Sequence, residues 1–260
     1  MRLIFVRHCD PYYPTDSLTE KGFKEAKLLS KRIKKWNILK AYSSPMGRAF
    51  TTAKIGLSKN KYLKTGEITV CPWLREFNYP VVDPLTNKNR ASWDLLPEFF
   101  TAEKNRDLFD FATWQNNEFL ETGDIKSFYK TVCDGLDGIL EEFDYKRNGL
   151  LYSTVRKEGQ SDFMERSTDV FKDYIDDRTV VIFCHLGVMG AMLSHLLNIS
   201  APSLWQGFFV APSSVTILNS EERTPGIASW RVQQMGDTAH LYAKKEPPSS
   251  SGYFASAFEY

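Results

Sequence analysis

The 260-residue sequence lacks several features that mark specialised classes of protein. Its apolar runs are far shorter than the roughly 20 residues of a transmembrane helix, and the run near the N-terminus is too short for the core of a signal peptide. Neither sign of charge is in excess, because 33 Lys and Arg stand against 32 Asp and Glu. We therefore predict a protein that binds neither a membrane nor nucleic acid.

Cysteine is scarce, and the common nucleotide-binding motifs are missing. The four cysteines, Cys9, Cys71, Cys133 and Cys184, show no C-x-x-C spacing, which favours free thiols in a reducing compartment. We expect a cytoplasmic location. The sequence has no internal repeat and no G-x-x-x-x-G-K-[ST], G-x-G-x-x-G or G-x-S-x-G motif. The common nucleotide-binding and serine-hydrolase classes therefore have no support.

Two apolar segments each lead into a histidine. Residues 3–6 precede Arg7 and His8, and residues 180–183 precede Cys184 and His185. Such runs predict buried strands, and open α/β sheets bind their ligands beyond the carboxyl ends of the strands. One histidine in this position would be an ordinary polar residue after a strand. Two of them indicate a functional site at one edge of a sheet.

Alternating strand and helix patterns over residues 1–76 and 159–244 predict a three-layer α/β/α fold with a mostly parallel central sheet. Thr19 is the expected N-cap of the first helix. Ser44 is the expected N-cap of the second helix, with Pro45 at its first position and Arg48 in its first turn. A further helix is predicted over residues 161–176.

Residues 77–158 interrupt this alternation with a segment rich in aromatic residues. We interpret them as an inserted helical cap, whose clearest element is an apolar stripe at helical spacing over residues 125–143. Its aromatic side chains form either the core of the cap or a stacking surface for a substrate, and the first interpretation is favoured. Residues 245–260 have the composition of a mobile tail, and the sequence does not indicate where the tail docks.

The convergence of the strand ends would gather Arg7, His8, Arg48 and His185 in one pocket. Two guanidiniums beside two imidazoles suit a tetrahedral dianion, because arginine matches phosphate oxygens in a bidentate way. Helix N-termini near Ser44 and His185 would add partial positive charge. The pattern therefore predicts a site for a phosphoryl group.

These residues resemble the histidine phosphatase superfamily, which includes the cofactor-dependent phosphoglycerate mutases. Arg7-His8-Cys9 is similar to the R-H-G signature of that family. Further matches follow in the family's order: Leu18-Thr19 with Gly22, Ser44-Pro45 with Arg48-Ala49 and Thr52-Ala53, Leu74-x-Glu76, Gly159-Gln160-Ser161, and His185-x-Gly187. The resemblance covers residues 1–76 and about 159–219, and residues 77–158 fall outside it.

The resemblance implies that His8 is a nucleophile that forms a phosphohistidine. Arg7, Arg48, His185 and Gly187 would bind the phosphoryl group, with His185 also stabilising its charge during transfer. Glu76 would donate the proton to the leaving alcohol, because Leu186 follows His185 where another branch of the family has an aspartate. No cofactor and no metal ion are expected, and the expected partner is a small-molecule phosphomonoester.

One residue departs from the family pattern. Cys9 stands where the family usually has glycine, so its side chain would either narrow the pocket or displace the backbone. Its thiol would be sensitive to oxidants only if it were exposed and readily ionised. We expect Asp10, Asp16 and Glu20 to be surface or capping groups, and His195 and His240 to have no part in the site.

Several functions stay open at this point. A phosphatase is favoured over a phosphoglycerate mutase, because the stretch between Asp10 and Gly22 lacks the Asn and the G-W pair of mutases. A zinc protein using His8-Cys9 and Cys184-His185 is a third possibility, although adjacent strand residues point to opposite faces. A catalytically weak scaffold that binds a phosphorylated partner is a fourth. The substrate and the oligomeric state are not determined by the sequence.

Overall fold

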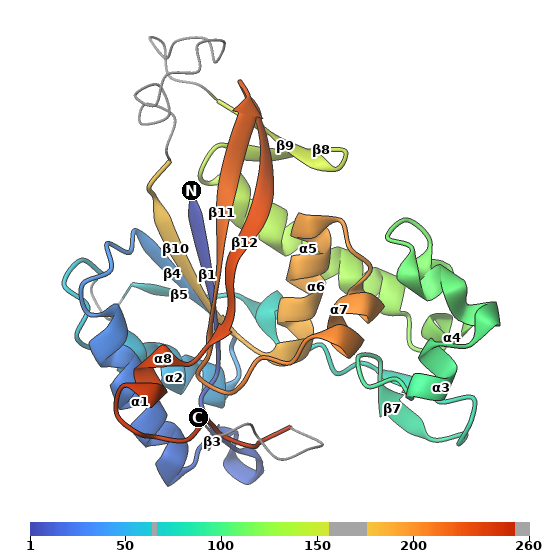
Figure 1. The fold of residues 1–260 in the computed structure, drawn as a ribbon, viewed down its shortest axis with the longest axis horizontal. Helices are drawn as coiled ribbons and strands as arrows, with labels where there is room; N and C mark the ends of the chain where they lie inside the picture. Colours follow the sequence, from blue (N-terminus) through green and yellow to red (C-terminus); the bar gives the residue numbers. More distant parts are fainter. Residues whose placement is uncertain (64–66, 156–175, 253–260) are drawn as a thin grey trace.

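A computed structural model describes residues 1–63, 67–155 and 176–252, and it is built around one eight-stranded sheet (Figure 1). In spatial order the strands are β5 (Ile68–Val70), β4 (Lys40–Ser43), β10 (Thr179–Cys184), β1 (Arg2–Arg7), β11 (Val215–Thr224), β12 (Ile227–Asp237), β9 (Leu151–Thr154) and β8 (Tyr145–Asn148). Two short pairs lie apart from this sheet: β2 (Pro11–Tyr12) with β3 (Ser17–Leu18), and β6 (Pro80–Val82) with β7 (Asn89–Ala91).

The predicted α/β class is confirmed, and the sheet is mixed. Strands β5, β4, β10 and β1 run parallel to one another, whereas β11, β12, β9 and β8 continue the sheet by antiparallel pairing. The antiparallel part begins with the β11–β12 hairpin, which turns at Pro225 and Gly226. Gly226 has a φ of 74°, a conformation that glycine adopts without steric cost.

Helices cover both faces of the parallel strands. Leu3 and Phe5 pack in one apolar cluster with residues of α5 (Ile125–Glu141) and α6 (Leu186–Leu197). Ile4 and Val6 pack in another with residues of α1 (Glu20–Ile33) and α2 (Gly47–Leu57). A strand buried on both faces is apolar at every position, which explains the continuous apolar runs in the sequence. Figure 1 shows the strands between these two sets of helices.

The helix starts test two sequence predictions. Thr19 caps α1 as predicted, because its hydroxyl accepts a hydrogen bond from the Gly22 N–H at 3.0 Å. The predicted start of α2 is wrong, since Met46 is its N-cap and the helix begins at Gly47. The Ser44 hydroxyl instead accepts the Met46 N–H at 3.2 Å within the turn that precedes the helix, and this turn delays the helix start.

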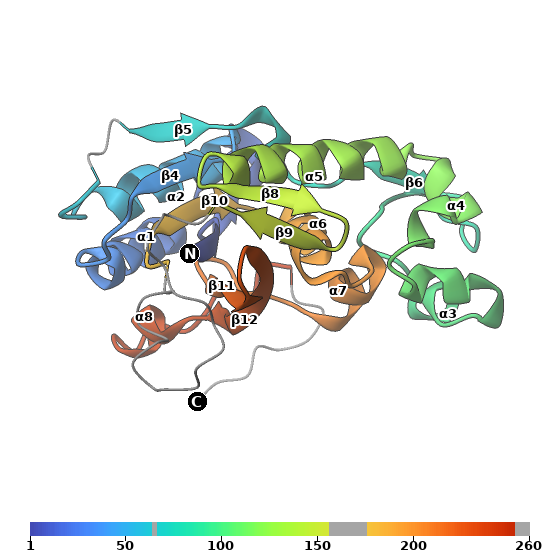
Figure 2. The ribbon, with the colours of Figure 1, turned by 90° about the horizontal axis from the view of Figure 1, so that it is seen from above.

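The segment from residue 77 onward forms several small elements before it returns to the sheet. They are β6, β7, α3 (Pro97–Phe100), the 3₁₀ segments Glu103–Phe109 and Trp114–Asn116, and α4 (Glu118–Glu121). Figures 1 and 2 place them at one end of the molecule, beyond α7 (Ala201–Gly207). The predicted apolar stripe forms α5, and β8 and β9 then join the edge of the central sheet. The division into core, cap and tail stays a prediction.

Aromatic residues of this segment pack on one another. The Tyr79 ring stacks on Phe128 with centroids 3.4 Å apart, and Trp114 meets the edge of Tyr129 at 4.8 Å. Most of its buried aromatic side chains share one apolar cluster with α6. These contacts agree with the interpretation that the aromatic residues form a core.

Part of the sequence prediction lies outside the described residues. The predicted helix over residues 161–176 and the Gly159-Gln160-Ser161 match fall there, except for residue 176. Within the described ranges, no helix has the length and apolar character needed to cross a membrane.

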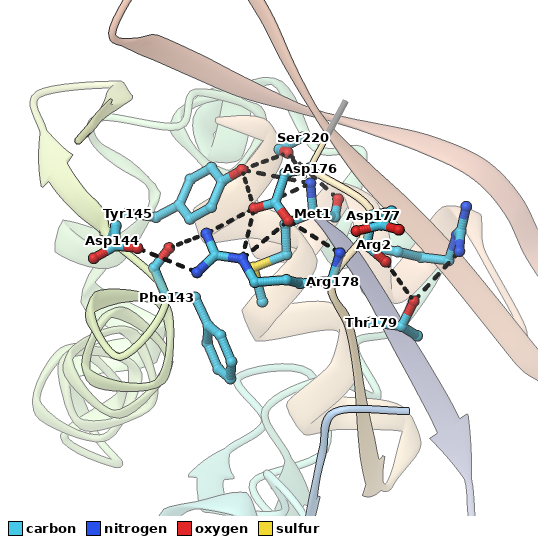
Figure 3. Close-up of polar contacts among 10 residues, drawn as sticks. All are labelled: Met1, Arg2, Phe143, Asp144, Tyr145, Asp176, Asp177, Arg178, Thr179 and Ser220. Atoms are coloured by element: carbon cyan, nitrogen blue, oxygen red, sulfur yellow. Dashed lines mark hydrogen bonds and ion pairs between the residues drawn. The ribbon is translucent and has the colours of Figure 1, made fainter. Parts of the chain in front are cut away.

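A polar cluster joins the amino end of β10 to the turn between α5 and β8 (Figure 3). The Arg178 guanidinium donates to the Phe143 carbonyl at 2.7 Å, and it pairs with Asp144 at 3.1 Å and with Asp176 at 2.8 Å. The Tyr145 hydroxyl also donates to Asp176, at 3.0 Å. One arginine therefore links the edge of the sheet to its parallel centre.

Substitution of Arg178 by methionine is expected to lower the free energy of unfolding by about 1–3 kcal/mol, because several charge-assisted hydrogen bonds are lost at once. Urea denaturation would measure the change. Arg223→Met is the matched control, since Arg223 is largely exposed and pairs only with Glu221 among the contacts in the described residues. Equal stabilities of the two variants would contradict a linking role for Arg178.

Candidate active site

His8 and His185 meet at the carboxyl ends of β1 and β10. Because these strands are parallel neighbours, both histidines emerge at the same edge of the sheet. Their ring centroids are 5.1 Å apart, and both residues are almost fully buried. The structure therefore brings together the two histidines that the sequence singled out.

The surroundings of His8 hold its ring in one tautomer. Nδ1 lies 2.8 Å from the Cys9 carbonyl oxygen, which only accepts hydrogen bonds, so Nδ1 carries the proton and Nε2 has a lone pair. The backbone of His8 is held on both sides by hydrogen bonds to Cys184 and Ser213. Burial lowers the pKa of His8 well below its usual value, and Arg7 and Arg48 lower it further. The ring is therefore a neutral base with a free nitrogen.

His185 lies at the N-cap position of α6, and its Nε2 is 2.8 Å from the Ser44 hydroxyl. Burial, followed by the neighbouring His8 and Arg48, lowers the pKa of His185 well below its usual value. Its Nδ1 is buried and has no hydrogen-bond partner among the described residues. An unpaired buried nitrogen is costly, so an atom of a bound ligand is the natural partner.

Arg48 is held in place by Asp16. The Arg48 Nη1 is 2.5 Å from Asp16 Oδ1, and Asp16 Oδ2 accepts the Gly47 N–H at 2.7 Å. Asp16 therefore accepts the first N–H group of α2, which agrees with its prediction as a surface or capping group. It also orients the buried Arg48 guanidinium. Sequence analysis missed this second role, because nothing local connects two residues that lie on separate elements.

Arg7 adds a second buried guanidinium. Its Nη1 donates to the Val210 carbonyl at 2.6 Å, and the guanidinium carbon lies 5.1 Å from the centroid of the Phe209 ring. Arginine stays protonated even when it is buried. The pocket therefore holds two fixed positive charges beside two neutral imidazoles, which is an arrangement suited to a phosphate dianion.

Glu76 lies at the N-terminus of α6. Its Oε1 accepts hydrogen bonds from the N–H groups of Phe77 at 2.8 Å, Gly187 at 2.9 Å and Val188 at 3.2 Å. Burial raises the pKa of the carboxyl group, and the N–H groups of Phe77 and Val188 and the charge of Arg7 oppose that shift in part. Glu76 is therefore a carboxyl group that holds its proton more readily than an exposed one, next to the histidine pair.

Gly187 was predicted to bind the phosphoryl group, and this role stays a prediction, since its N–H donates to Glu76. The structure shows that close packing requires glycine here. A Cβ atom at this position would lie 2.8 Å from Glu76 Oε1 and 2.7 Å from the Trp93 ring, so any larger residue would displace one of them. Trp93 belongs to the segment of residues 77–158, and sequence analysis did not identify it. No signal in its neighbourhood marks it, since it reaches Gly187 only through the tertiary fold.

The Cys9 side chain points away from this pocket. The side chain packs against Leu18 and Ala26, and the backbone N–H of Cys9 donates to the Thr52 hydroxyl at 3.0 Å. Successive residues of an extended chain point to opposite sides, so His8 and Cys9 diverge. Burial, followed by the nearby Glu25, raises the pKa of the thiol well above its usual value. Cys9 thus meets neither condition for oxidant sensitivity.

We expect Cys9 of the native protein to react with iodoacetamide at least about 100-fold more slowly than a free thiol, because the thiolate is the reactive species. Mass spectrometry after timed labelling at pH 8 would measure the rate. Labelling in denaturant is the control, in which Cys9 should react as an ordinary thiol. Rapid labelling of Cys9 in the native protein would contradict its buried position.

The remaining candidate features lie outside this cluster. His195 pairs with Asp137 between α6 and α5, and His240 lies near Arg32 and Ser213. Within the described ranges, no group of three or more His, Cys, Asp or Glu side chains is arranged to hold a metal ion. The Cys184 side chain packs in the apolar cluster that includes residues of α6. It therefore points away from the pocket in which a zinc ion shared with His8 would lie.

Comparisons with known proteins agree with this geometry. Residues 3–112 and 139–233 match the model of the histidine phosphatase superfamily, branch 1. The match therefore includes residues 77–112 and 139–158, which sequence analysis placed outside the resemblance. Comparison with curated protein sequences found no match.

Several solved structures share the fold at low sequence identity. One is a phosphoserine phosphatase mutant from Entamoeba histolytica in complex with phosphoserine, with 17% identity, a TM-score of 0.55, and coverage of 92% of this chain and 98% of that one. A mycobacterial glucosyl-3-phosphoglycerate phosphatase has 17% identity, a TM-score of 0.53 and coverage of 91% and 99%. The α-ribazole phosphatase from Shigella flexneri has 17% identity, a TM-score of 0.51 and coverage of 91% and 96%. On its matched residues, this chain belongs to the histidine phosphatase superfamily, branch 1.

Proposed function

We propose that the protein hydrolyses small phosphomonoesters through a phosphohistidine on His8. The observation that carries this proposal is the state of the His8 ring, which is neutral, fixed by the Cys9 carbonyl and placed near two buried guanidiniums. A histidine attacks phosphorus only through an unprotonated nitrogen, and here Nε2 is that nitrogen. Neither a cofactor nor a metal ion has a part in the proposed reaction.

In the first step, Arg7, Arg48 and His185 Nδ1 hold the non-bridging oxygens of the substrate. His8 Nε2 forms a bond to phosphorus as the bond from phosphorus to the alcohol oxygen breaks. Glu76 gives its proton to that oxygen, so a neutral alcohol leaves. The phosphorylated ring gains positive charge, which its Nδ1–H shares with the Cys9 carbonyl. Positioning and fixed charge supply most of the rate enhancement in such a transfer.

In the second step, water attacks phosphorus and gives a proton to the Glu76 carboxylate. The bond from phosphorus to Nε2 breaks, and the electron pair returns to His8. Inorganic phosphate leaves, and Glu76 is again protonated. The same carboxyl group thus serves first as acid and then as base, and its raised pKa suits both roles.

The similar structures support a substrate class. The named structures are phosphatases of phosphoserine, of a phosphorylated ribazole and of a glucosylated phosphoglycerate. Each name describes a phosphorylated small molecule. We infer a phosphomonoester of similar size for this protein.

The proposal is tested by hydrolysis of 4-nitrophenyl phosphate, phosphoserine and 3-phosphoglycerate in excess EDTA. We expect release of inorganic phosphate from at least the first of these, and inhibition by orthovanadate. Isomerisation of 3-phosphoglycerate without phosphate release would instead indicate a mutase. Binding of orthovanadate without any turnover would indicate a phosphate-binding scaffold.

A further inference from the structure

The chain returns to the active site after the last helix of the described residues. Residues 246–252, here called the C-terminal strap, follow α8 (Ala239–Tyr242) and lie at the end of the sheet toward which β1 and β10 point (Figure 1). Among the described residues this is the last segment of the chain. Sequence analysis assigned it to a tail and did not indicate where that tail docks, so its position is information that only the tertiary structure supplies.

The first anchor of the strap is on α1. The Glu246 carboxylate pairs with Lys21 at 3.0 Å and with Lys24, and the Lys21 ammonium also donates to the Pro247 carbonyl at 2.6 Å. Glu246 is 8% exposed, which is unusual for a glutamate in a tail. A carboxylate with two cationic partners and little contact with water is held in a defined place.

The second anchor is on the loop that follows the nucleophile. Ser249 is 1% exposed, and its hydroxyl donates to Asp10 Oδ1. Asp10 lies two residues after His8, and its N–H donates to the buried Glu25 carboxylate at 2.8 Å. The Ser251 N–H closes a turn onto the Ser249 hydroxyl at 3.0 Å. The strap is therefore tied to the segment that carries the reactive histidine.

Beyond this anchor the strap reaches Arg7. A methyl group built on Gly252 would lie 3.4 Å from Arg7 Nη2 and 3.5 Å from the Phe209 ring. The backbone of Gly252 is thus next to a guanidinium that the proposed reaction uses to hold a phosphoryl oxygen. The part of the substrate beyond the ester oxygen must extend out of the pocket, so residues at the pocket opening contact it.

We propose that the C-terminal strap forms the Arg7 side of the substrate pocket and limits the size of the phosphomonoester that reaches His8. The inference rests on the proposed function for its substrate class, and it rests on the two anchors for its structure. A compact ester passes the strap, whereas an ester embedded in a peptide collides with it. The strap thereby selects small metabolites over phosphoproteins.

Binding of phosphonate analogues tests the strap without requiring turnover. The probes are phosphonomethyl-phenylalanine and a peptide of about ten residues that contains it, which share the phosphonate and differ in bulk. Calorimetry gives the ratio of their dissociation constants for three chains, which end at residues 260, 252 and 245. In the chain ending at 245, this ratio should shift in favour of the peptide by at least about tenfold relative to the full chain, which corresponds to about 1.4 kcal/mol. The chain ending at 252 should match the full chain.

Two results would overturn the proposal. One is an unchanged ratio for the chain ending at 245. The other is an equal change for the chain ending at 252, which would assign the effect to residues 253–260. A changed ratio in a protein without phosphatase activity would keep the strap and overturn the proposed function instead.

Point variants of the full chain guard against misfolding of the shortened ones. Glu246→Gln combined with Ser249→Ala weakens both anchors, because it removes the charge of Glu246 and the hydroxyl of Ser249, and it leaves the chain length unchanged. We expect the same direction of change in the ratio, with a Tm close to that of the wild type. Glu98→Gln combined with Ser127→Ala is the matched control, because both residues are exposed and distant from the strap in sequence. Equal ratios in the two double variants would overturn the role of the anchors.

Discussion

Substitution of His8 by alanine is expected to lower kcat for 4-nitrophenyl phosphate by at least about 10⁴-fold, because water must then attack phosphorus directly. The remaining rate would come from the two guanidiniums and His185, which still bind the phosphoryl oxygens. Steady-state release of 4-nitrophenol measures the loss. His195→Ala is the matched control, since His195 pairs with Asp137 between two helices and lies outside the pocket.

A second measurement separates loss of the nucleophile from loss of the fold. The His8→Ala variant should still bind orthovanadate, since Arg7 and Arg48 keep their partners Val210 and Asp16. Rapid quenching of the wild type in alkali should trap a phosphoryl group on the protein that is stable in alkali and labile in acid. The variant should trap none. Turnover by the variant at the wild-type rate would show that another residue is the nucleophile.

Substitution of Glu76 by glutamine is expected to lower kcat/KM for phosphoserine by about 10²–10⁴-fold, the usual range for loss of a general acid. The effect on 4-nitrophenyl phosphate should be much smaller, because 4-nitrophenolate leaves without a proton. Glutamine keeps an oxygen for the N–H groups of Phe77, Gly187 and Val188, so the local structure should be retained. Stopped assays with both substrates measure the difference.

The pH dependence provides a further test of Glu76. The first step needs the protonated carboxyl group, and burial raises its pKa. The wild-type kcat/KM for phosphoserine should therefore fall as the pH rises through this raised value, and this decline should be absent from the Glu76→Gln variant. Protonation of His8 should not lower kcat/KM when the pH falls just below the usual pKa of histidine, since burial and Arg7 keep the ring neutral at that pH. An equal loss for both substrates would indicate that Glu76 has a structural role only.

The sequence by itself determined the edge of the sheet at which the site lies. Continuous apolar runs ending at His8 and His185 predict parallel buried strands, and parallel neighbours place their carboxyl ends together. Thr19 was likewise predictable as an N-cap, because its partner Gly22 is three residues away. The divergence of His8 and Cys9 follows from the alternation of an extended chain. All of these features depend on neighbours along the chain or on a general rule of topology.

Only the tertiary structure decided which distant residues support the site. Asp16 reaches Arg48, Trp93 packs on Gly187, and the strap brings Gly252 to Arg7. The antiparallel half of the sheet and the position of β8 and β9 at its edge were likewise decided only by the tertiary structure. Each contact depends on the path of a loop between two elements, and local composition and periodicity do not encode that path. Burial then follows from the fold, and it shifts the pKa values of His8 and Glu76 toward the states that the proposed reaction needs.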